Sequence, residues 1–275
     1  MPFEQTDQPY DAWARAYRDW WAPTIAPAAV RLLDRVSSPA FGERPFQLLD
    51  VGTGTGALAI AALERWPLAT VIGVDPASRM LELAAEEAER RGVADRLRLS
   101  IGRADRIPLD DASVDGAISS FVIQLVPSRI AALREVARVV RPGGLFACVT
   151  WQAEDLAFAP DDAFMVVVDE LGIDPPPLDG GARPYTSPQA AASELRRAGF
   201  ERASARVEWL EHRYTPERYL DTLEHWIESE LFSSLGYVRR RQLRAAALRR
   251  MRRLPRDAFV WRRPLISVLG FRRVR

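Results

Sequence analysis

The sequence predicts an α/β fold in which helices cover both faces of a doubly wound, mostly parallel sheet. Two observations carry this prediction. Between residues 46 and 151, β-rich apolar segments alternate with helix-compatible segments, as they do in such sheets. A glycine-rich turn joins the first apolar segment to the first helix, which is typical of nucleotide-binding α/β proteins. The 275 residues, of which 48% are hydrophobic, are enough for one large domain with a sizeable core.

The first segment has the order strand, acid, glycine turn, helix. A mostly apolar run over residues 46–49 is followed by Asp50 and then by a turn that contains Gly52, Thr53, Gly54 and Gly56. A helix-compatible run from Ala57 to Glu64 comes next. Glycine permits a positive φ and the close approach of a ligand, and the helix N-terminus presents unpaired N–H groups there. The turn therefore predicts a ligand site, with a tight turn that binds nothing as the alternative.

The glycine spacing distinguishes between nucleotide classes. In the dinucleotide fingerprint the third glycine follows the second by three residues, whereas Gly56 comes one residue earlier. The carboxylate of Asp50 would repel a pyrophosphate but suits a ligand with an ammonium group. Spacing and acid together resemble motif I of the Rossmann-like S-adenosylmethionine (SAM) methyltransferases. A nucleotide other than SAM is the alternative ligand for this turn.

A second acid follows the second apolar segment. Residues 69–74 are β-rich and end in Asp75, 19 residues after the last glycine of the turn. An acid at about that distance accepts hydrogen bonds from ribose hydroxyls in nucleotide-binding folds. An N-cap for the next helix is the alternative, and Asp75 can serve both roles. Pro76 restricts the local backbone, and Met80, about one turn later, either covers an adenine face or packs in the core.

Two further segments resemble the same family. Residues 102–115 resemble the stretch that carries its adenine contact, but Arg103 stands where the family has an acid for the adenine amino group. That contact is then expected from Asp105 or from the backbone of Ala104, and a solvated loop acid is the alternative role of Asp105. By the same resemblance, Ser120, at the end of the fourth predicted strand, is expected at the cofactor site.

The segment Arg141-Pro-Gly-Gly-Leu145 resembles the family's turn before the fifth strand. The matches span roughly residues 46–151 in the family's order, so the chain resembles class I methyltransferases of the small-molecule or quinone-precursor type. This resemblance implies SAM as cofactor and a seven-stranded sheet whose last strand is antiparallel and lies beside the fifth. We also expect a cytoplasmic protein, since we find no basic leader and no apolar run of about 18 residues.

The segments outside this core have expected roles as well. We expect a helical N-terminal cap at residues 1–40 and a SAM-binding core at residues 46–151. Two lid insertions are expected at residues 152–186 and 211–257, and the last strand at residues 258–275. Tyr10 and Tyr17 lie on one face of the cap helix, and the resemblance implies that they contact SAM, with packing onto the sheet as the alternative. Ser37-Ser-Pro-Ala is expected to lead into the core, and Pro264 to lie at an edge or a bulge of the last strand.

Candidates for catalysis are few. Relatives carry a histidine where Gln124 stands, so the general base is unassigned, and Gln124 itself is kept as a candidate. By residue type, the other candidates are His212 and His225, both in or near the lid. A helix with Tyr219, Leu223 and Trp226 could point His225 into a substrate cavity; a surface or core role is the alternative. No N-P-P-Y or D-P-P-Y motif follows the fourth strand, which argues against methylation of nucleic-acid bases or protein glutamine.

Composition limits the remaining functions. Two histidines and one cysteine offer no metal-ligand cluster, and all 38 basic residues are arginines. From Val238 onward there are 14 arginines and one acid, Asp257, which indicates either docking on the acidic body or an anionic partner. We favour docking together with a solvated face.

The expected function is SAM-dependent methyl transfer to an oxygen or carbon of a small molecule. A homodimer is one candidate assembly, and nucleic acid is not expected as a partner. Two alternatives remain at this stage. One is a methyltransferase that binds RNA or a membrane surface through the arginine-rich helix, and the other is a fold relative that binds SAM without transferring methyl.

Overall fold

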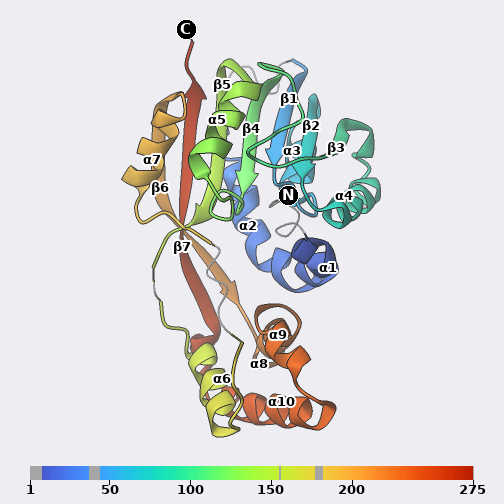
Figure 1. Ribbon diagram of the computed structural model, residues 1–275, viewed down its shortest axis with the longest axis vertical. Coiled ribbons are helices and arrows are strands. Elements are labelled where there is room, and N and C mark those ends of the chain that lie inside the picture. The colour runs from blue at the N-terminus through green and yellow to red at the C-terminus, as the bar shows by residue number, and fades with distance from the viewer. Residues whose placement is uncertain (1–7, 37–43, 155, 177–181, 275) are drawn as a thin grey trace.

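The computed structural model describes residues 8–36, 44–154, 156–176 and 182–274, so the segment Ser37 to Ala40 lies outside the described residues. Seven strands form one sheet in the order β3-β2-β1-β4-β5-β7-β6 (Figure 1). Neighbouring strands from β3 to β5 are parallel, and β7 is antiparallel to both β5 and β6. The predicted doubly wound sheet, with an antiparallel last strand beside the fifth, is confirmed.

The strands are β1 (Phe46–Val51), β2 (Ala69–Asp75), β3 (Leu97–Ile101), β4 (Val114–Ser120), β5 (Val140–Trp151), β6 (Phe200–Arg213) and β7 (Val260–Arg272). The elements between them in the sheet-bearing lobe are α3 (Ala57–Arg65), α4 (Ser78–Arg90), η2 (Ala94–Arg96), α5 (Arg129–Val139) and α7 (Pro188–Arg197). Both predicted ends of β1 and α3 fall within two residues of the observed ones, because the glycine turn separates them sharply.

The central strands are buried on both faces, as expected for a parallel sheet between two helical layers. Leu48 and Leu49 are consecutive and both are fully buried. Leu48 packs in the cluster that α3 shares, whereas Leu49 packs in the cluster that α5 and α7 share. Successive side chains of a strand point to opposite faces, so this pair marks the two layers of the fold.

The glycine pair of residues 143 and 144 is not a turn before the fifth strand, which corrects the sequence expectation. β5 begins at Val140, and its register with β4 jumps from Val114↔Val140 to Gly116↔Leu145. The intervening residues form a bulge opposite Asp115. A Cβ on Gly144 would lie 2.5 Å from the Asp115 carbonyl oxygen, so strand pairing explains the small residue.

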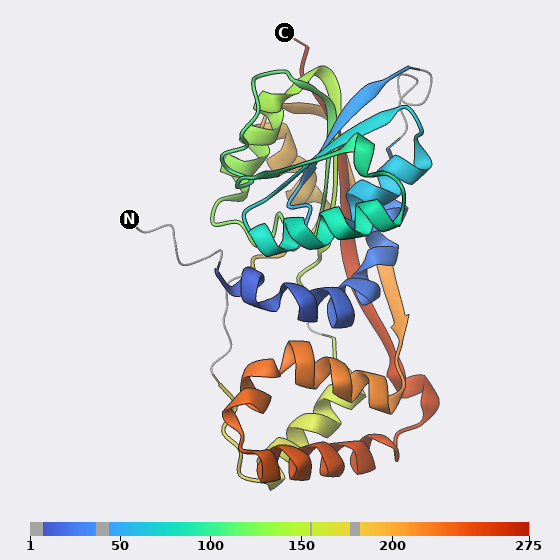
Figure 2. The ribbon, with the colours of Figure 1, turned by 90° about the vertical axis from the view of Figure 1, so that its right-hand side faces the viewer.

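The lid is a separate helical lobe carried on an extension of β6 and β7 (Figures 1 and 2). Its elements are α6 (Ala159–Glu170), α8 (Pro216–Thr222), η3 (Leu223–Ile227), α9 (Ser229–Ser234), α10 (Tyr237–Met251) and η4 (Arg256–Phe259). Phe164 of α6 stacks on Phe232 of α9 with ring centroids 5.8 Å apart. The two predicted insertions therefore meet in one lobe, although residues 155 and 177–181 of the first lie outside the described part.

Pro264 lies where β7 leaves the sheet. β5 pairs with β7 from Leu145↔Phe271 to Trp151↔Leu265, and Pro264 is the next residue along β7 toward the lid. At Pro264, β7 has β6 as its paired neighbour, through Trp209. The expectation of an edge position is met, because a proline there leaves the β5–β7 ladder intact.

The N-terminal cap consists of α1 (Gln8–Ala16), a π-helical turn η1 (Tyr17–Trp21) and α2 (Ala22–Leu32). Figure 2 shows α1 lying between the sheet-bearing lobe and the lid lobe. The Asp11 carboxylate of α1 accepts a hydrogen bond of 2.8 Å from the backbone N–H of Arg79 in the first turn of α4. The cap is thereby fixed to the N-terminus of α4, where a carboxylate is favoured.

Candidate functional site

A cavity of about 280 Å³ opens at the carboxyl ends of the parallel strands, beneath the N-terminal cap. Ligands of open α/β sheets bind at this edge. Eleven predicted site residues line the cavity: Tyr10, Tyr17, Gly52, Gly54, Asp75, Pro76, Met80, Ala104, Asp105, Ser120 and Gln124. The remaining four predicted residues, Asp50, Thr53, Gly56 and His225, do not line it.

The glycine turn forms the floor of the cavity. Gly54 and Gly56 have φ values of +53° and +84°, in the region that favours glycine, and Gly56 is the N-cap of α3. A Cβ on Gly54 would meet no atom within 4 Å, whereas one on Gly56 would lie 3.0 Å from the Cβ of Ala84. Gly54 therefore leaves room for a ligand, while Gly56 allows α3 and α4 to pack closely.

Asp75 ties the glycine turn to the next strand. Its Oδ2 accepts a hydrogen bond of 2.8 Å from the Gly54 N–H, and its Oδ1 accepts one of 3.0 Å from the Ala77 N–H. Ala77 lies just before the first helical residue of α4, so the hydrogen bond from Ala77 to Asp75 lies outside the first turn. Within that turn a backbone N–H group is bonded by Asp11, so Asp75 does not act as a side-chain cap of α4. Asp75 lines the cavity, and a carboxyl group accepts hydrogen bonds from hydroxyls, so it can meet the hydroxyl groups of a ligand.

Asp50 lies directly beneath the turn. It is 1% exposed, and its Oδ2 accepts a hydrogen bond of 2.8 Å from the Thr53 hydroxyl. Its Oδ1 has no hydrogen-bond partner among the described protein atoms. Burial raises the pKa of Asp50 to about 7, although the hydrogen bond from Thr53 acts in the opposite direction. A buried carboxyl directly beneath the glycine turn fits a cationic ligand above that turn, because the ligand's charge would stabilise the ionised form.

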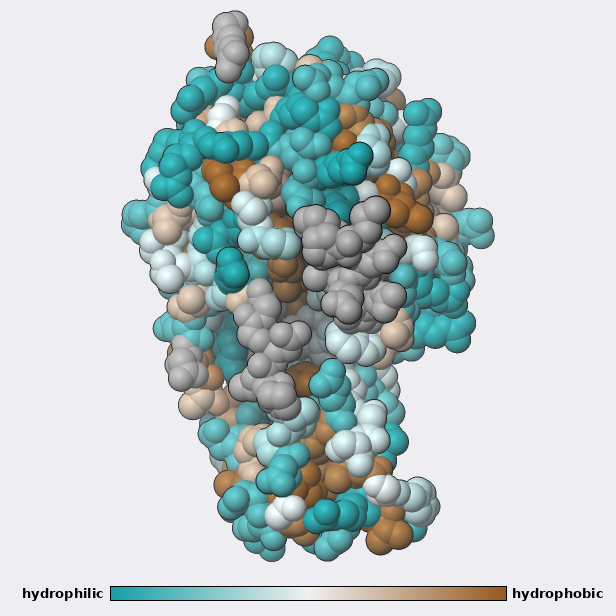
Figure 3. All heavy atoms as spheres, viewed as in Figure 1, coloured by the Kyte–Doolittle hydropathy of each residue, from teal (hydrophilic) through white to brown (hydrophobic). Residues whose placement is uncertain are grey.

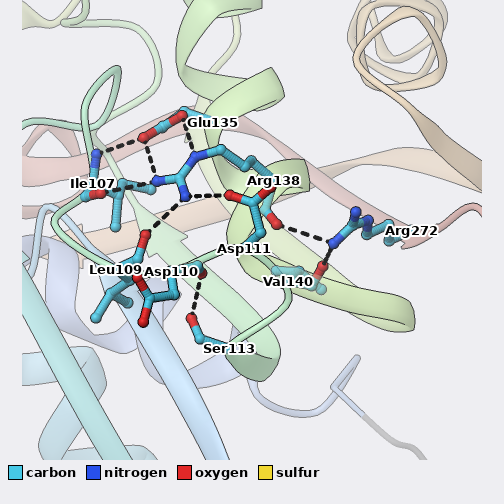
Figure 4. Close-up of polar contacts among 9 residues, drawn as sticks. All are labelled: Ile107, Leu109, Asp110, Asp111, Ser113, Glu135, Arg138, Val140 and Arg272. Atoms are coloured by element: carbon cyan, nitrogen blue, oxygen red, sulfur yellow. Dashed lines mark hydrogen bonds and ion pairs between the residues drawn. The ribbon is translucent and has the colours of Figure 1, made fainter.

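The loop after β3, which contains Ala104 and Asp105, forms the wall next to Asp75. The Arg103 guanidinium donates to the Asp105 carboxylate at 3.1 Å. Farther along the loop, Arg138 of α5 donates to the carbonyl oxygens of Ile107 and Leu109, at 3.0 and 2.8 Å. Figure 4 shows the Arg138 side chain at the centre of this network, which also contains Glu135 and Asp111. The loop is thus anchored to α5, and its cavity-lining part is held in place.

The cap closes the cavity with tyrosines. Tyr10 of α1 and Tyr17 of η1 both line it, and Met80 faces them from α4. Burial raises the pKa of both phenols, with Asp75 as a further cause, so both remain protonated near neutral pH. A protonated phenol is a hydrogen-bond donor, which suits an anionic or carbonyl group of a ligand.

The other end of the cavity is an aromatic chamber, which we define by the side chains of Tyr17, Trp21, Phe121, Trp151 and Trp226. Trp226 of η3 stacks on Trp21 of η1 at a centroid distance of 6.4 Å, and Phe121 lies 4.6 Å from Trp151. Phe121 follows the end of β4 with a φ of +57°, an uncommon conformation for a bulky residue. Sequence reasoning missed Trp21, Phe121 and Trp151, although two of the three stand at strand ends.

Gln124 lines the cavity, but both ends of its amide are engaged. Its Nε2 donates to the Phe121 carbonyl oxygen at 2.5 Å, and its Oε1 accepts from the Thr150 hydroxyl. Gln124 is 2% exposed and Thr150 is fully buried. An amide does not take up a proton near neutral pH, so the geometry supports a role in holding the Phe121 turn rather than in proton transfer.

His225 lies outside the cavity, which corrects the expectation that it points inward. It is exposed and stacks on Trp20 with centroids 4.7 Å apart. The next residue of η3, Trp226, lines the cavity instead. His212, the second histidine, contacts Tyr214 at 4.4 Å, also away from the cavity.

Comparisons with known proteins agree with this geometry. A family model described as "Methyltransferase domain" matches residues 49–148. The chain is 33% identical over 185 residues to a ubiquinone/menaquinone biosynthesis C-methyltransferase UbiE of Bradyrhizobium diazoefficiens, covering 62% of this chain and 70% of that relative. It is 37% identical over 139 residues to a malonyl-[acyl-carrier protein] O-methyltransferase of Xylella fastidiosa, covering 48% of this chain and 45% of that relative. The chain thus spans under half of the latter's length.

Solved structures share the fold. The [4+2]-cyclase SpnF superimposes with a TM-score of 0.61 at 19% identity, covering 98% of this chain and 97% of that chain. A Haemonchus contortus phosphoethanolamine N-methyltransferase, in complex with phosphomonomethylethanolamine and S-adenosylhomocysteine, has a TM-score of 0.58 at 16% identity, covering 97% of this chain and 58% of that chain. At these identities the likeness concerns the fold.

Proposed function

The chain belongs to the SAM-dependent methyltransferase family, and from this premise we propose that it transfers a methyl group to an oxygen or carbon atom of a small-molecule acceptor. The observation that carries the proposal is the single cavity that joins two chemically different ends. One end has the glycine turn and Asp75, and the other is the aromatic chamber. A donor and an acceptor bound at these two ends would lie side by side.

In this proposal, the cofactor end holds SAM through residues already on the cavity wall. Asp75 accepts hydrogen bonds from the ribose, while Met80 and the Ala104–Asp105 backbone enclose the adenine. Asp50, buried beneath the turn, contributes a negative charge that suits the positive charges of SAM. Tyr10 and Tyr17 close this end from the cap. The spare Oδ1 of Asp50 and the open space above Gly54 support the fit.

Bound SAM supplies a methyl group activated by its sulfonium. The side chains of the aromatic chamber orient the acceptor and exclude water, and orientation of this kind is worth roughly 7–11 kcal/mol in favourable cases. The negative faces of tryptophan and tyrosine rings also favour a cation nearby. His225 and His212 lie outside the cavity, so we assign neither of them a proton-transfer role.

Calorimetry with SAM tests the cofactor end. The wild type should bind SAM, and Asp75→Ala should weaken binding roughly a hundredfold, because hydrogen bonds to a charged group contribute about 1.5–3 kcal/mol each. Asp95→Ala, a change at an exposed acid of η2, is the matched control and should bind as the wild type does. Absence of SAM binding to the folded wild type would refute the proposal.

Turnover tests the acceptor end. Formation of S-adenosylhomocysteine should depend on an added acceptor, and a panel of phenols, enols and amines would identify the reacting atom. Tight SAM binding without methyl transfer to any acceptor would instead favour a fold relative that does not methylate. That outcome has a structural precedent, since one similar structure is named as a cyclase.

A further inference from the structure

The arginine-rich helix α10 lies at the outer end of the lid lobe, farthest from the sheet (Figures 1 and 2). It begins at Tyr237 and ends at Met251, and its first turn and interior contain no acid. From Val238 to the last residue of the sequence there are 14 arginines and one acid. Such a helix must either pair its charges within the molecule or present them to a partner.

One face of α10 docks on the lid. Arg240 and Arg244 both pair with Glu224, whose side chain is 8% exposed, and Arg244 also pairs with Asp221. Arg252 pairs with Glu217 at 2.8 Å, just past the end of the helix. These contacts agree with the docking that the charge distribution favoured. They also connect α10 to η3, the turn that supplies Trp226 to the aromatic chamber.

Another face of α10 is free of such pairing. Arg241, Arg249 and Arg253 are exposed, and no ion pair involves them in the described part of the chain. Arg241 and Arg249 are eight residues apart on the exposed side of α10, about 12 Å along its axis, and Arg253 lies in the turn just after the helix. Ala245, also exposed, lies between Arg241 and Arg249 in the sequence. We call these three arginines the basic stripe.

Two apolar side chains stand at the start of the same helix. Tyr237 and Val238 are 72% and 75% exposed, the highest values among the large hydrophobic residues of the described chain. Figure 3 shows hydrophobic and hydrophilic residues side by side at the lower end of the molecule, over the lid helices. The Arg241 guanidinium lies over the Tyr237 ring, 5.6 Å from its centroid, so cation and aromatic ring form one surface. Exposed apolar side chains beside cations without an ion pair are typical of surfaces that contact lipid headgroups and the adjoining acyl region.

We propose that the basic stripe, together with Tyr237 and Val238, docks the lid on an anionic membrane surface. The charges supply the attraction to anionic headgroups, and the two apolar residues enter the interface. A helix at the extremity of the long axis can meet a flat surface without obstruction from the rest of the molecule (Figure 2). A nucleic-acid backbone would also attract the arginines, but it would leave Val238 in water.

Sedimentation with lipid vesicles tests this docking. The wild type should bind vesicles of three parts phosphatidylcholine to one part phosphatidylglycerol at low salt, and pure phosphatidylcholine vesicles far more weakly. The triple change Arg241→Gln, Arg249→Gln and Arg253→Gln should lower the partition coefficient roughly a hundredfold, at about fivefold for each arginine. Added salt should weaken the binding of the wild type, since exposed charges are screened, and leave the smaller part that apolar insertion supplies.

A matched variant controls for net charge. Arg98, Arg134 and Arg197 are exposed on the sheet-bearing lobe and have no ion pair among the described residues. Their replacement by glutamine changes the net charge by the same amount and should leave vesicle binding within about twofold of the wild type. Circular dichroism melting checks that both triple variants fold.

Three results would overturn the membrane assignment. The wild type could fail to bind anionic vesicles at low salt, or the control variant could lose binding as strongly as the basic-stripe variant. The third is that the wild type binds a short single-stranded RNA but no vesicles, and that the basic-stripe variant loses this RNA binding. That result would assign the stripe to nucleic acid.

A second variant, Tyr237→Ser with Val238→Ser, tests the apolar part of the docking. It should weaken the vesicle binding that persists at high salt, because apolar insertion is not screened.

Discussion

The protonation of Asp50 should make the stability of this protein depend on pH in a predictable way. Burial raises the pKa of Asp50 to about 7 in the folded state, against about 3.9 in an unfolded chain. Between these values the folded protein binds the extra proton. The free energy of unfolding therefore falls as the pH rises from about 4 to about 7, and the contribution is constant above that.

The magnitude follows from the shift. Asp50 is 1% exposed, so solvent does not screen its environment. A shift of about three units, at 1.36 kcal/mol for each unit, corresponds to at most about 4 kcal/mol of lost stability once the carboxyl is fully ionised. Asp50→Asn keeps an acceptor for the Thr53 hydroxyl but removes the titration. Between pH 5 and pH 7 the wild type should lose about 2 kcal/mol relative to Asp50→Asn.

Urea unfolding of both proteins at half-unit steps from pH 5 to pH 8 measures this difference. Thr53→Val removes a hydrogen bond that lowers the pKa of Asp50, so its profile should level off at a higher pH than that of the wild type. Parallel profiles for the wild type and Asp50→Asn, with a constant difference across the range, would refute the reasoning. Saturating SAM should move the wild-type profile toward lower pH, because a bound cation favours the carboxylate.

Three further predictions concern the chamber, the glycine turn and the lid. In a methyl-transfer assay, Trp226→Ala should lower kcat/KM for the acceptor roughly tenfold to a hundredfold, because the acceptor would be less well oriented. His225→Ala, on the exposed side of the same turn, should leave kcat/KM within about twofold of the wild-type value. Gly54→Ala should weaken SAM binding in calorimetry at a stability cost of about 1–2 kcal/mol, while Gly56→Ala, whose methyl group would press on α4, should destabilise the fold more in urea. Glu224→Gln should lower the free energy of unfolding by about 1–3 kcal/mol, because a buried carboxylate is lost from between two half-exposed arginines; a loss below about 0.5 kcal/mol would contradict this.

The cofactor end of the site was predictable because its signals are local. Asp50 and Asp75 lie at the carboxyl ends of β1 and β2, the glycines follow β1, and the carboxyl ends of parallel strands meet at one edge of a sheet. Their sequence spacing therefore already implies their proximity. The structure brings these residues together as the pattern indicates, and their roles toward SAM stay predictions until binding is measured.

The aromatic chamber could not be predicted in the same way. Its side chains come from the cap, the ends of β4 and β5, and the lid, and no spacing in the sequence relates these four places. Within the lid, Trp226 follows Tyr219 and Leu223 by seven and three residues, so a regular helical period places it on the same face as these two residues. His225 was chosen by residue type, but it comes two residues after Leu223 and lies on another face, against Trp20.

The bulge at residues 141–144 is a different kind of departure. Pro-Gly-Gly is a general turn signal, and sequence reasoning located it correctly between a helix and the main part of β5. In the fold, the Arg141 side chain pairs with Asp115 at 2.8 Å, and pairing of β4 with β5 resumes on both sides of the irregularity. Tertiary pairing thus incorporated into the strand a segment that would form a free turn by itself.

The position of β7 has a consequence for how the chain folds as it is made. β7 follows every other strand in the sequence, yet it lies between β5 and β6, and it is the strand paired with β6 in the described part of the chain. All lid elements except α6 are synthesised between β6 and β7, which takes several seconds at about 5–20 residues per second. During that interval β6 has no neighbour for its backbone, and it presents Val207 and Trp209 on an open edge. Nascent chains that stop before Val260 should therefore aggregate or require a chaperone, whereas chains released after Arg272 can close the sheet.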